Sequence, residues 1–97
     1  MSYYFHPAAE AEHLESIAYF ESKRAGLGAS YLAEFERIMG IACAAPHRYP
    51  VEKLSGVRRI RMKRFPFAVL FREDSGTVQV LAVAHVRRRP QYWLGRL

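Results

Sequence analysis

The apolar residues of this chain change their spacing between Pro46 and Gly56, and this change limits the folds that the chain can adopt. Before Pro46, apolar residues recur three and four positions apart, as in amphipathic helices. After Gly56, they alternate with basic residues or form a short continuous run, as in strands. We therefore expect an α+β fold in which a helical first half packs against a sheet formed by the second half.

The first half predicts a short strand and then a helix. Residues 3–6 are aromatic and favour a strand, and Pro7 suits the first turn of a helix because its missing N–H is not needed there. The first helix is expected over residues 8–24, and Gly26 is expected to end it. Its apolar stripe is expected to consist of Leu14, Ile17 and Ala18.

A second helix is expected from about residue 29 to Pro46. Because only Gly26-Leu27-Gly28 separates it from the first helix, the two are expected to pack as an antiparallel hairpin. Its expected apolar stripe is Leu32, Phe35, Ile38, Met39 and Ala42, and the residues expected off the stripe are Glu34, Glu36 and Arg37.

The second half predicts three strands. Residues 59–63 alternate basic and apolar side chains, so Ile60 and Met62 are expected to face the core. Residues 65–71 are apolar on both faces and predict a central strand, and a turn over residues 73–76 leads into a last strand over residues 77–86. Strict alternation puts Val78, Val80, Ala82, Ala84 and Val86 on one face of that strand, and Gln79, Leu81, Val83, His85 and Arg87 on the other.

The expected element order is therefore β-α-α-β-β-β. The helix hairpin is expected to cover one face of a small, mainly antiparallel sheet, with residues 1–97 forming one domain. A single cysteine, Cys43, excludes an internal disulfide framework. The chain has no apolar run of the roughly 20 residues that a membrane span needs, so we expect no membrane partner. The N-terminus does not resemble a signal peptide, and a cytoplasmic location is expected.

Charge is divided unevenly between the two halves of the chain. The formal net charge is +6. Residues 1–45 carry six acidic and three basic side chains, whereas residues 46–97 carry three acidic and twelve basic ones. This asymmetry suggests an acidic partner for the second half, which is either a nucleic acid or an acidic protein segment, and charge alone does not choose between them.

Metal and cofactor chemistry are not supported by the sequence. The four histidines, His6, His13, His47 and His85, form no pair at ligand spacing, and no cluster of carboxylates is expected on the sheet. The Gly26-x-Gly28 pair joins two helices and lacks the preceding strand of a phosphate-binding loop. We therefore expect no metal and no cofactor.

The basic residues of the second half are the candidate binding surface. We expect the sheet face opposite the helices to be open and cationic, so that its side chains bind phosphates or other anions. A metal-free RNase would also need a proton shuttle, for which His85 and Tyr92 are the candidates. The structural alternative for His85 is a hydrogen bond at the end of its strand. For Tyr92-Trp93 the alternative is an aromatic plug on the open edge of the sheet, and we favour this role for Trp93. The candidate target-binding residues are Arg59, Arg61, Lys63, Arg64, Arg87, Arg88, Arg89 and Trp93.

The sequence resembles the RelE/ParE superfamily of toxins from type II toxin–antitoxin systems, in particular its ParE-like plasmid-stabilisation branch. The resemblance rests on Val57-Arg58-Arg59, on Arg64-Phe65-Pro66-Phe67-Ala68-Val69-Leu70-Phe71-Arg72, and on the run from Val80 through Ala84-His85 and Arg87-Arg88-Arg89-Pro90 to Tyr92-Trp93. The helix hairpin and the His47-Arg48-Tyr49-Pro50 loop also fit. The family fold, two helices against a small antiparallel sheet, agrees with the pattern described above.

The resemblance implies a growth-inhibiting toxin that a cognate antitoxin neutralises. Family antitoxins use a flexible segment that folds on the toxin, and an acidic, amphipathic segment would suit this basic chain. The partners implied are thus the antitoxin, in a hetero-oligomeric complex, and a cellular target.

Two targets are implied by different branches of the superfamily. ParE-type members poison DNA gyrase without an RNase site, whereas RelE-type members cut mRNA in the ribosome with basic residues and a C-terminal tyrosine. The positions here that match the second set are Arg61, Lys63, Arg87 and Tyr92, and with His85 they give a candidate catalytic set of His85, Arg87 and Tyr92. Because the Arg-Arg-Arg-Pro-Gln-Tyr-Trp string resembles the ParE-like branch, we favour gyrase and a non-enzymatic toxin.

Overall fold

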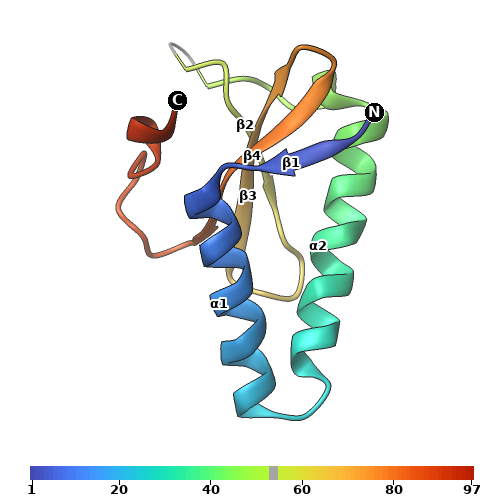
Figure 1. Ribbon diagram of the computed structural model, residues 1–97, viewed down its shortest axis with the longest axis vertical. Coiled ribbons are helices and arrows are strands. Elements are labelled where there is room, and N and C mark those ends of the chain that lie inside the picture. Colours follow the sequence, from blue (N-terminus) through green and yellow to red (C-terminus); the bar gives the residue numbers. More distant parts are fainter. Residues whose placement is uncertain (53–54) are drawn as a thin grey trace.

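The computed structural model describes residues 1–52 and 55–97 and shows two helices packed on one face of a four-stranded sheet (Figure 1). This confirms the predicted α+β class and the predicted order of strands and helices. The elements are β1 (Tyr3–Phe5), α1 (Pro7–Lys23), α2 (Leu27–Ala44), the 3₁₀ turn η1 (Pro46–Arg48), β2 (Arg58–Arg61), β3 (Phe67–Asp74), β4 (Thr77–His85) and the 3₁₀ turn η2 (Leu94–Arg96).

The strands lie in the order β1-β4-β3-β2. The β2–β3 and β3–β4 pairs are antiparallel, and only the short β1 runs parallel to its neighbour, β4. The β3–β4 hairpin turns at Ser75 and Gly76, which both have positive φ, at 52° and 83°. Two consecutive left-handed residues define the type I′ turn, whose twist matches that of the flanking strands.

The helices form the predicted antiparallel hairpin, and two glycines close it (Figure 1). Gly26 has φ of 87°, a left-handed conformation that favours glycine. Gly28 faces α1 so closely that an added Cβ would lie 2.8 Å from the carbonyl oxygen of Ile17. The Glu21 carboxylate accepts hydrogen bonds from the N–H groups of both glycines, so the end of α1 holds the start of α2.

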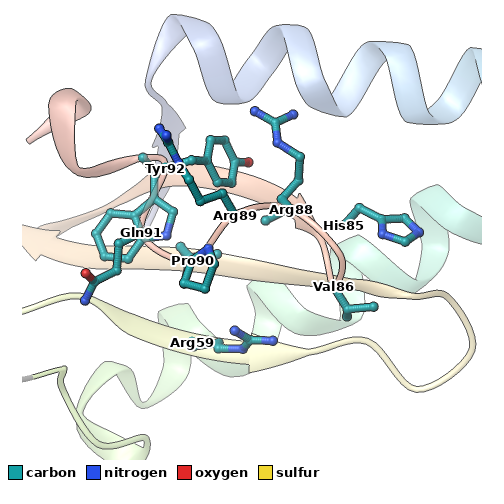
Figure 2. A pocket seen from close by; sticks show the side chains of 11 residues that line it. Arg59, His85, Val86, Arg88, Arg89, Pro90, Gln91 and Tyr92 are labelled. Atoms are coloured by element: carbon teal, nitrogen blue, oxygen red, sulfur yellow. The ribbon is translucent and has the colours of Figure 1, made fainter.

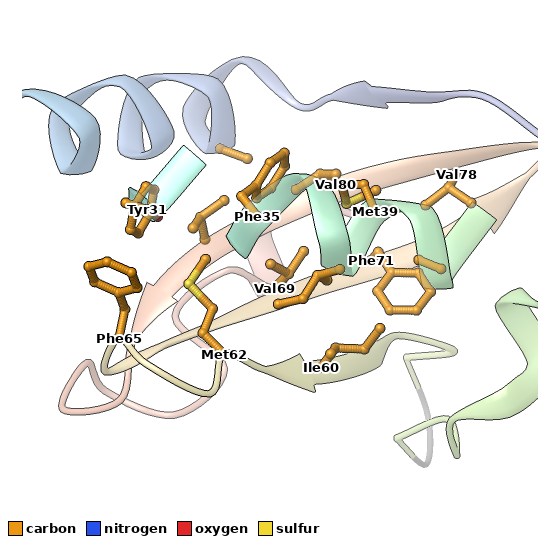
Figure 3. Packing of buried hydrophobic residues seen from close by; sticks show 14 residues of the cluster. Tyr31, Phe35, Met39, Ile60, Met62, Phe65, Val69, Phe71, Val78 and Val80 are labelled. Atoms are coloured by element: carbon orange, nitrogen blue, oxygen red, sulfur yellow. The ribbon is translucent and has the colours of Figure 1, made fainter. Parts of the chain in front are cut away.

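The main core fills the space between the helices and the sheet (Figure 3). As predicted, Phe35, Ile38, Met39 and Ala42 of α2 are buried there. Ile60 and Met62 also face this core, as the alternation in the second half predicted. Tyr31 is fully buried as well, although the expected stripe did not include it.

The buried face of α1 differs from the predicted stripe. Leu14 is 59% exposed and Ala18 is exposed, whereas Ala9, His13 and Ser16 are the buried residues of the helix. The His13 ring lies against the rings of Phe5 and Phe35, with centroids 5.1 and 4.2 Å away. Of the predicted stripe, only Ile17 packs against the main core. The prediction was wrong for Leu14 and Ala18 because the aromatic cluster takes up a histidine instead.

A second difference is a β-bulge in β4. Leu70 pairs with Ala82 and Phe71 pairs with Val80, so Leu81 is an extra residue. The extra residue reverses the alternation, and Val83 therefore joins Val78 and Val80 in the main core. The expected alternation holds through Leu81, which lies opposite Val78 and Val80, and it is wrong from Ala82 onward.

The sheet face opposite the helices is also covered, which corrects the expectation of an open surface. A second cluster lies there, and it is closed by Trp93, which is 3% exposed. The bulge brings Ala82 and Ala84 to this face, where they add to Leu70 of β3, and Trp93 folds over them from a part of the chain that no local pattern links to the sheet. The other members of the cluster are Val57, Ala68, Leu70, Leu81, Ala82 and Ala84. Among the helices of the described chain, none is long and apolar enough to cross a membrane.

Candidate functional site

The C-terminal segment, residues 86–97, runs back across the sheet after β4. The N–H of Val86 donates to the Pro66 carbonyl at 2.9 Å, and the chain then turns so that Trp93 enters the second cluster. Gln91 adopts a left-handed conformation, with φ of 60°. For a residue other than glycine this conformation is uncommon, and it persists only where the surrounding packing holds it.

Glu12 of α1 fastens this segment to the rest of the molecule. Its carboxylate accepts two hydrogen bonds from the Arg96 guanidinium, at 3.0 and 2.8 Å, and one from the Tyr92 hydroxyl at 2.7 Å. A fourth comes from the backbone N–H of Val83 at 3.1 Å. The paired, two-point geometry between arginine and carboxylate is the strong form of this interaction.

Glu12 and Arg96 also cover the exposed edge of β4. β1 pairs with β4 only as far as Val80, so the edge of β4 beyond it has no neighbouring strand. Glu12 accepts from the N–H of Val83, and Arg96 donates to the Leu81 carbonyl at 2.9 Å. The two side chains thus replace the strand bonds that β1 would have made, as unpaired edges require.

These contacts shift the pKa values of the acidic groups involved. Burial raises the pKa of Glu12, but hydrogen bonds from Arg96, Tyr92 and Val83 outweigh burial and bring the net pKa below its usual value. Burial, and then the hydrogen bond to Glu12, raises the pKa of the Tyr92 hydroxyl. The Tyr92 proton is therefore held between two oxygens inside the protein.

His85 lies at the end of β4, next to Phe67, with ring centroids 5.1 Å apart. Its Nδ1 accepts a hydrogen bond from the backbone N–H of Arg87 at 3.0 Å. Because the bulge reverses the end of β4, His85 lies on the same side of the sheet as Val83, and its ring points away from Arg59 (Figure 2). This is the strand-end hydrogen bond that the sequence left open as the alternative.

Three of the predicted arginines line a pocket between β2 and the C-terminal segment, with Arg59 on one side and the Arg88 and Arg89 side chains extending toward α1 on the other (Figure 2). Arg59 comes from β2, and Arg88 and Arg89 come from the segment. No acidic side chain lines this pocket, whose volume is about 90 Å³. The remaining lining residues are Leu70, Ala84, His85, Val86, Pro90, Gln91, Tyr92 and Trp93.

The other predicted residues lie outside the pocket or serve the fold. Arg61 donates to backbone carbonyls of the turn that joins β2 to β3, including that of Phe65 at 2.8 Å. Lys63 and Arg64 are exposed in this turn, and the N–H of Lys63 donates to Glu34 at 2.9 Å. Arg87 is exposed beside the pocket. Trp93 is a buried aromatic plug, as the sequence favoured, but it covers the sheet face opposite the helices and not the open edge.

Sequence reasoning missed the carboxylates that hold these segments. Glu12 and Arg96 are 84 positions apart, and no local pattern links them. Glu34 was expected to lie off the apolar stripe, but it is 9% exposed and pairs with Arg37 at 2.6 Å. Hydrogen bonds from Arg37 and from the N–H of Lys63 lower the pKa of Glu34. Within residues 1–52 and 55–97, no group of histidine, cysteine or acidic residues is arranged to hold a metal ion.

Comparison with known proteins identifies the class to which this fold belongs. The family model of the ParE toxin of the type II toxin–antitoxin system parDE matches residues 3–90. The chain therefore belongs to the ParE toxin family, and a toxin of such a system has a cognate antitoxin as its partner.

A solved structure supports the fold. The chain is similar to a protein of the chromosomal ParDE toxin–antitoxin system from P. aeruginosa, with a TM-score of 0.62 and 18% sequence identity. The match covers 88% of this chain and 95% of the other. A comparison with curated protein sequences gave no match.

Proposed function

We propose that this toxin stops bacterial growth by binding DNA gyrase and trapping it on cleaved DNA, and that its antitoxin reverses this effect in a hetero-oligomeric complex. Family membership over residues 3–90 supports the toxin part of the proposal. A gyrase target places the activity in the cytoplasm. The domain that acts is proposed to be the whole of residues 1–97.

The observation that favours binding over catalysis is the state of the two candidate proton shuttles. Tyr92 donates its proton to Glu12, and its pKa is raised. His85 uses Nδ1 for a backbone N–H and points away from Arg59. General acid–base catalysis needs shuttles that reach the substrate with pKa values near the working pH, and the held Tyr92 hydroxyl does not fit this requirement.

Purified gyrase and supercoiled plasmid test this proposal. Adding the toxin is expected to increase gyrase-linked cleaved DNA, and adding the antitoxin is expected to remove the increase. Arg87 is exposed and outside the pocket, so Arg87→Glu is expected to reduce cleavage if this end of the molecule contacts the target. Arg24→Glu, at the far end of α1, is the matched control. Unchanged plasmid over a wide range of toxin concentration would refute the proposal.

The alternative function is a ribosome-dependent, metal-independent mRNA endonuclease. It is supported by the arginines that line the pocket, whose positive charges would stabilise a phosphorane. Primer extension after induction would then show new 5′ ends at codon positions, and Tyr92→Phe or Arg87→Ala would abolish them. Intact transcripts in growth-arrested cells would exclude this alternative.

A further inference from the structure

The pocket between β2 and the C-terminal segment concentrates positive charge that the protein does not neutralise. Arg59, Arg88 and Arg89 line it, all three are exposed, and its lining contains no acidic residue. A volume of about 90 Å³ is several times the roughly 10–15 Å³ that one water needs. The pocket is therefore large enough for a polyatomic anion.

Two of the three pocket arginines have side chains that are not used to hold the fold together. Arg37, Arg61 and Arg96 each bind a carboxylate or backbone carbonyls. In contrast, the side chains of Arg59 and Arg89 have no hydrogen bond or ion pair with any residue of the described ranges 1–52 and 55–97. Their donors are available to a ligand.

Arg88 is held in place by an aromatic ring. Its guanidinium carbon lies 3.9 Å from the centroid of the Tyr92 ring, and Tyr92 is itself fixed by Glu12. A stacked guanidinium keeps its N–H groups free at its edge, so it binds an anion with little loss of side-chain freedom.

The aromatic residues around the pocket are already occupied. The Tyr92 ring has Arg88 over it and Arg96 5.0 Å from its centroid, and Trp93 is buried. Neither ring offers a free face on which a nucleobase could stack, as proteins that bind single strands through their bases require. The pocket can therefore recognise charge but not bases.

We propose that this pocket binds the phosphodiester backbone of a nucleic acid, independently of base sequence. The arginines form charge-assisted hydrogen bonds with phosphate oxygens of neighbouring nucleotides. The proposal goes beyond the proposed function, because a protein that traps gyrase need not touch nucleic acid itself. DNA and RNA both contain the phosphodiester group that the arginines would bind, and the experiment below distinguishes the two.

Fluorescence anisotropy with the purified, full-length toxin tests the proposal. The probes are a labelled DNA duplex, single-stranded DNA and single-stranded RNA of the same sequence. The probe that binds with the highest affinity identifies the kind of nucleic acid that the pocket prefers. With two to three phosphates neutralised, log K should fall with log salt with a slope of about −2 to −3 for duplex DNA, and a scrambled sequence should bind equally well.

Three single variants separate the pocket from general positive charge. Arg59→Gln and Arg89→Gln should each reduce the salt slope by about one and weaken binding to all sequences alike. Arg24→Gln removes the same charge at the far end of the helix hairpin and should leave binding unchanged. Because these side chains are exposed, thermal unfolding midpoints should match that of the parent protein.

Three results would overturn the proposal. The first is an absence of saturable binding to all three probes. The second is a loss of affinity in Arg24→Gln equal to the loss in Arg59→Gln and Arg89→Gln. The third is displacement of the nucleic acid by polyglutamate at equal charge concentration, which would assign the pocket to an acidic protein segment. Because the plasmid cleavage assay is a separate measurement, failure here leaves the gyrase proposal intact, and failure there leaves this one intact.

Discussion

At the scale of single residues, Glu12 joins elements that the sequence keeps far apart. Its carboxylate is shared by α1, the edge of β4 and the C-terminal segment through four hydrogen bonds. Glu12→Gln removes the charge and half of the acceptor capacity, so Arg96 or the Val83 N–H is left without its partner. We expect the free energy of unfolding to fall by about 1–3 kcal/mol, measured by urea denaturation.

The matched control for this prediction is Glu15→Gln, on the exposed side of the same helix. Its unfolding free energy should stay within about 0.5 kcal/mol of the parent value. Equal stability of the Glu12 and Glu15 variants would contradict the anchoring role of Glu12.

At the scale of secondary-structure elements, the helix hairpin depends on Gly28 for its close contact. Gly28→Ala places a methyl group 2.8 Å from the carbonyl oxygen of Ile17, so the helices must move apart. We expect a loss of about 1–3 kcal/mol in unfolding free energy, measured by thermal or urea denaturation.

Gly40→Ala makes the same change on the same helix, and it is the control. No atom lies within 4 Å of the added Cβ at Gly40, which is exposed. The greater helix propensity of alanine should then stabilise the protein by up to about 1 kcal/mol. If both variants gained the same stability, helix propensity and not close packing would govern the hairpin.

The elements also show what local patterns predict well and what they miss. As the sequence indicated, α1 ends before Gly26 and α2 ends before Pro46, because the backbone constraints of glycine and proline act locally. The start of α2 at Leu27 is two residues earlier than expected, and Gly26 caps it. The bulge at Leu81 and the buried His13 depend on partners distant in sequence, Leu70 and Phe35, so no spacing rule reveals them. The same holds for the site: the predicted Arg59, Arg88 and Arg89 line one pocket, whereas the predicted Arg61, Lys63 and Arg64 lie outside it, and the Glu12 anchor was not predicted.

At the scale of the whole molecule, the stability of the fold depends on pH through three groups whose pKa values are all lowered by folding. Burial lowers the pKa of His13, and hydrogen bonds lower the net pKa of Glu12 and of Glu34 below the usual value. In each case the unfolded chain binds protons more readily than the folded one, so stability rises with pH. The contribution of His13 is fully present above its unfolded value of about 6.5 and is lost as the pH falls through that region.

The carboxylates of Glu12 and Glu34 affect stability at lower pH than His13 does. Their contribution is fully present above the unfolded value of about 4.3 and is lost as the pH falls toward their folded values. The urea midpoint should therefore fall in two steps, one just below pH 6.5 and one below about 4.3. His13→Phe, which keeps an aromatic ring between Phe5 and Phe35, should remove the upper step, and Glu12→Gln should reduce the lower one. If the upper step persisted in His13→Phe, another histidine would control it, and the aromatic cluster around His13 would not be the part of the fold that senses acid.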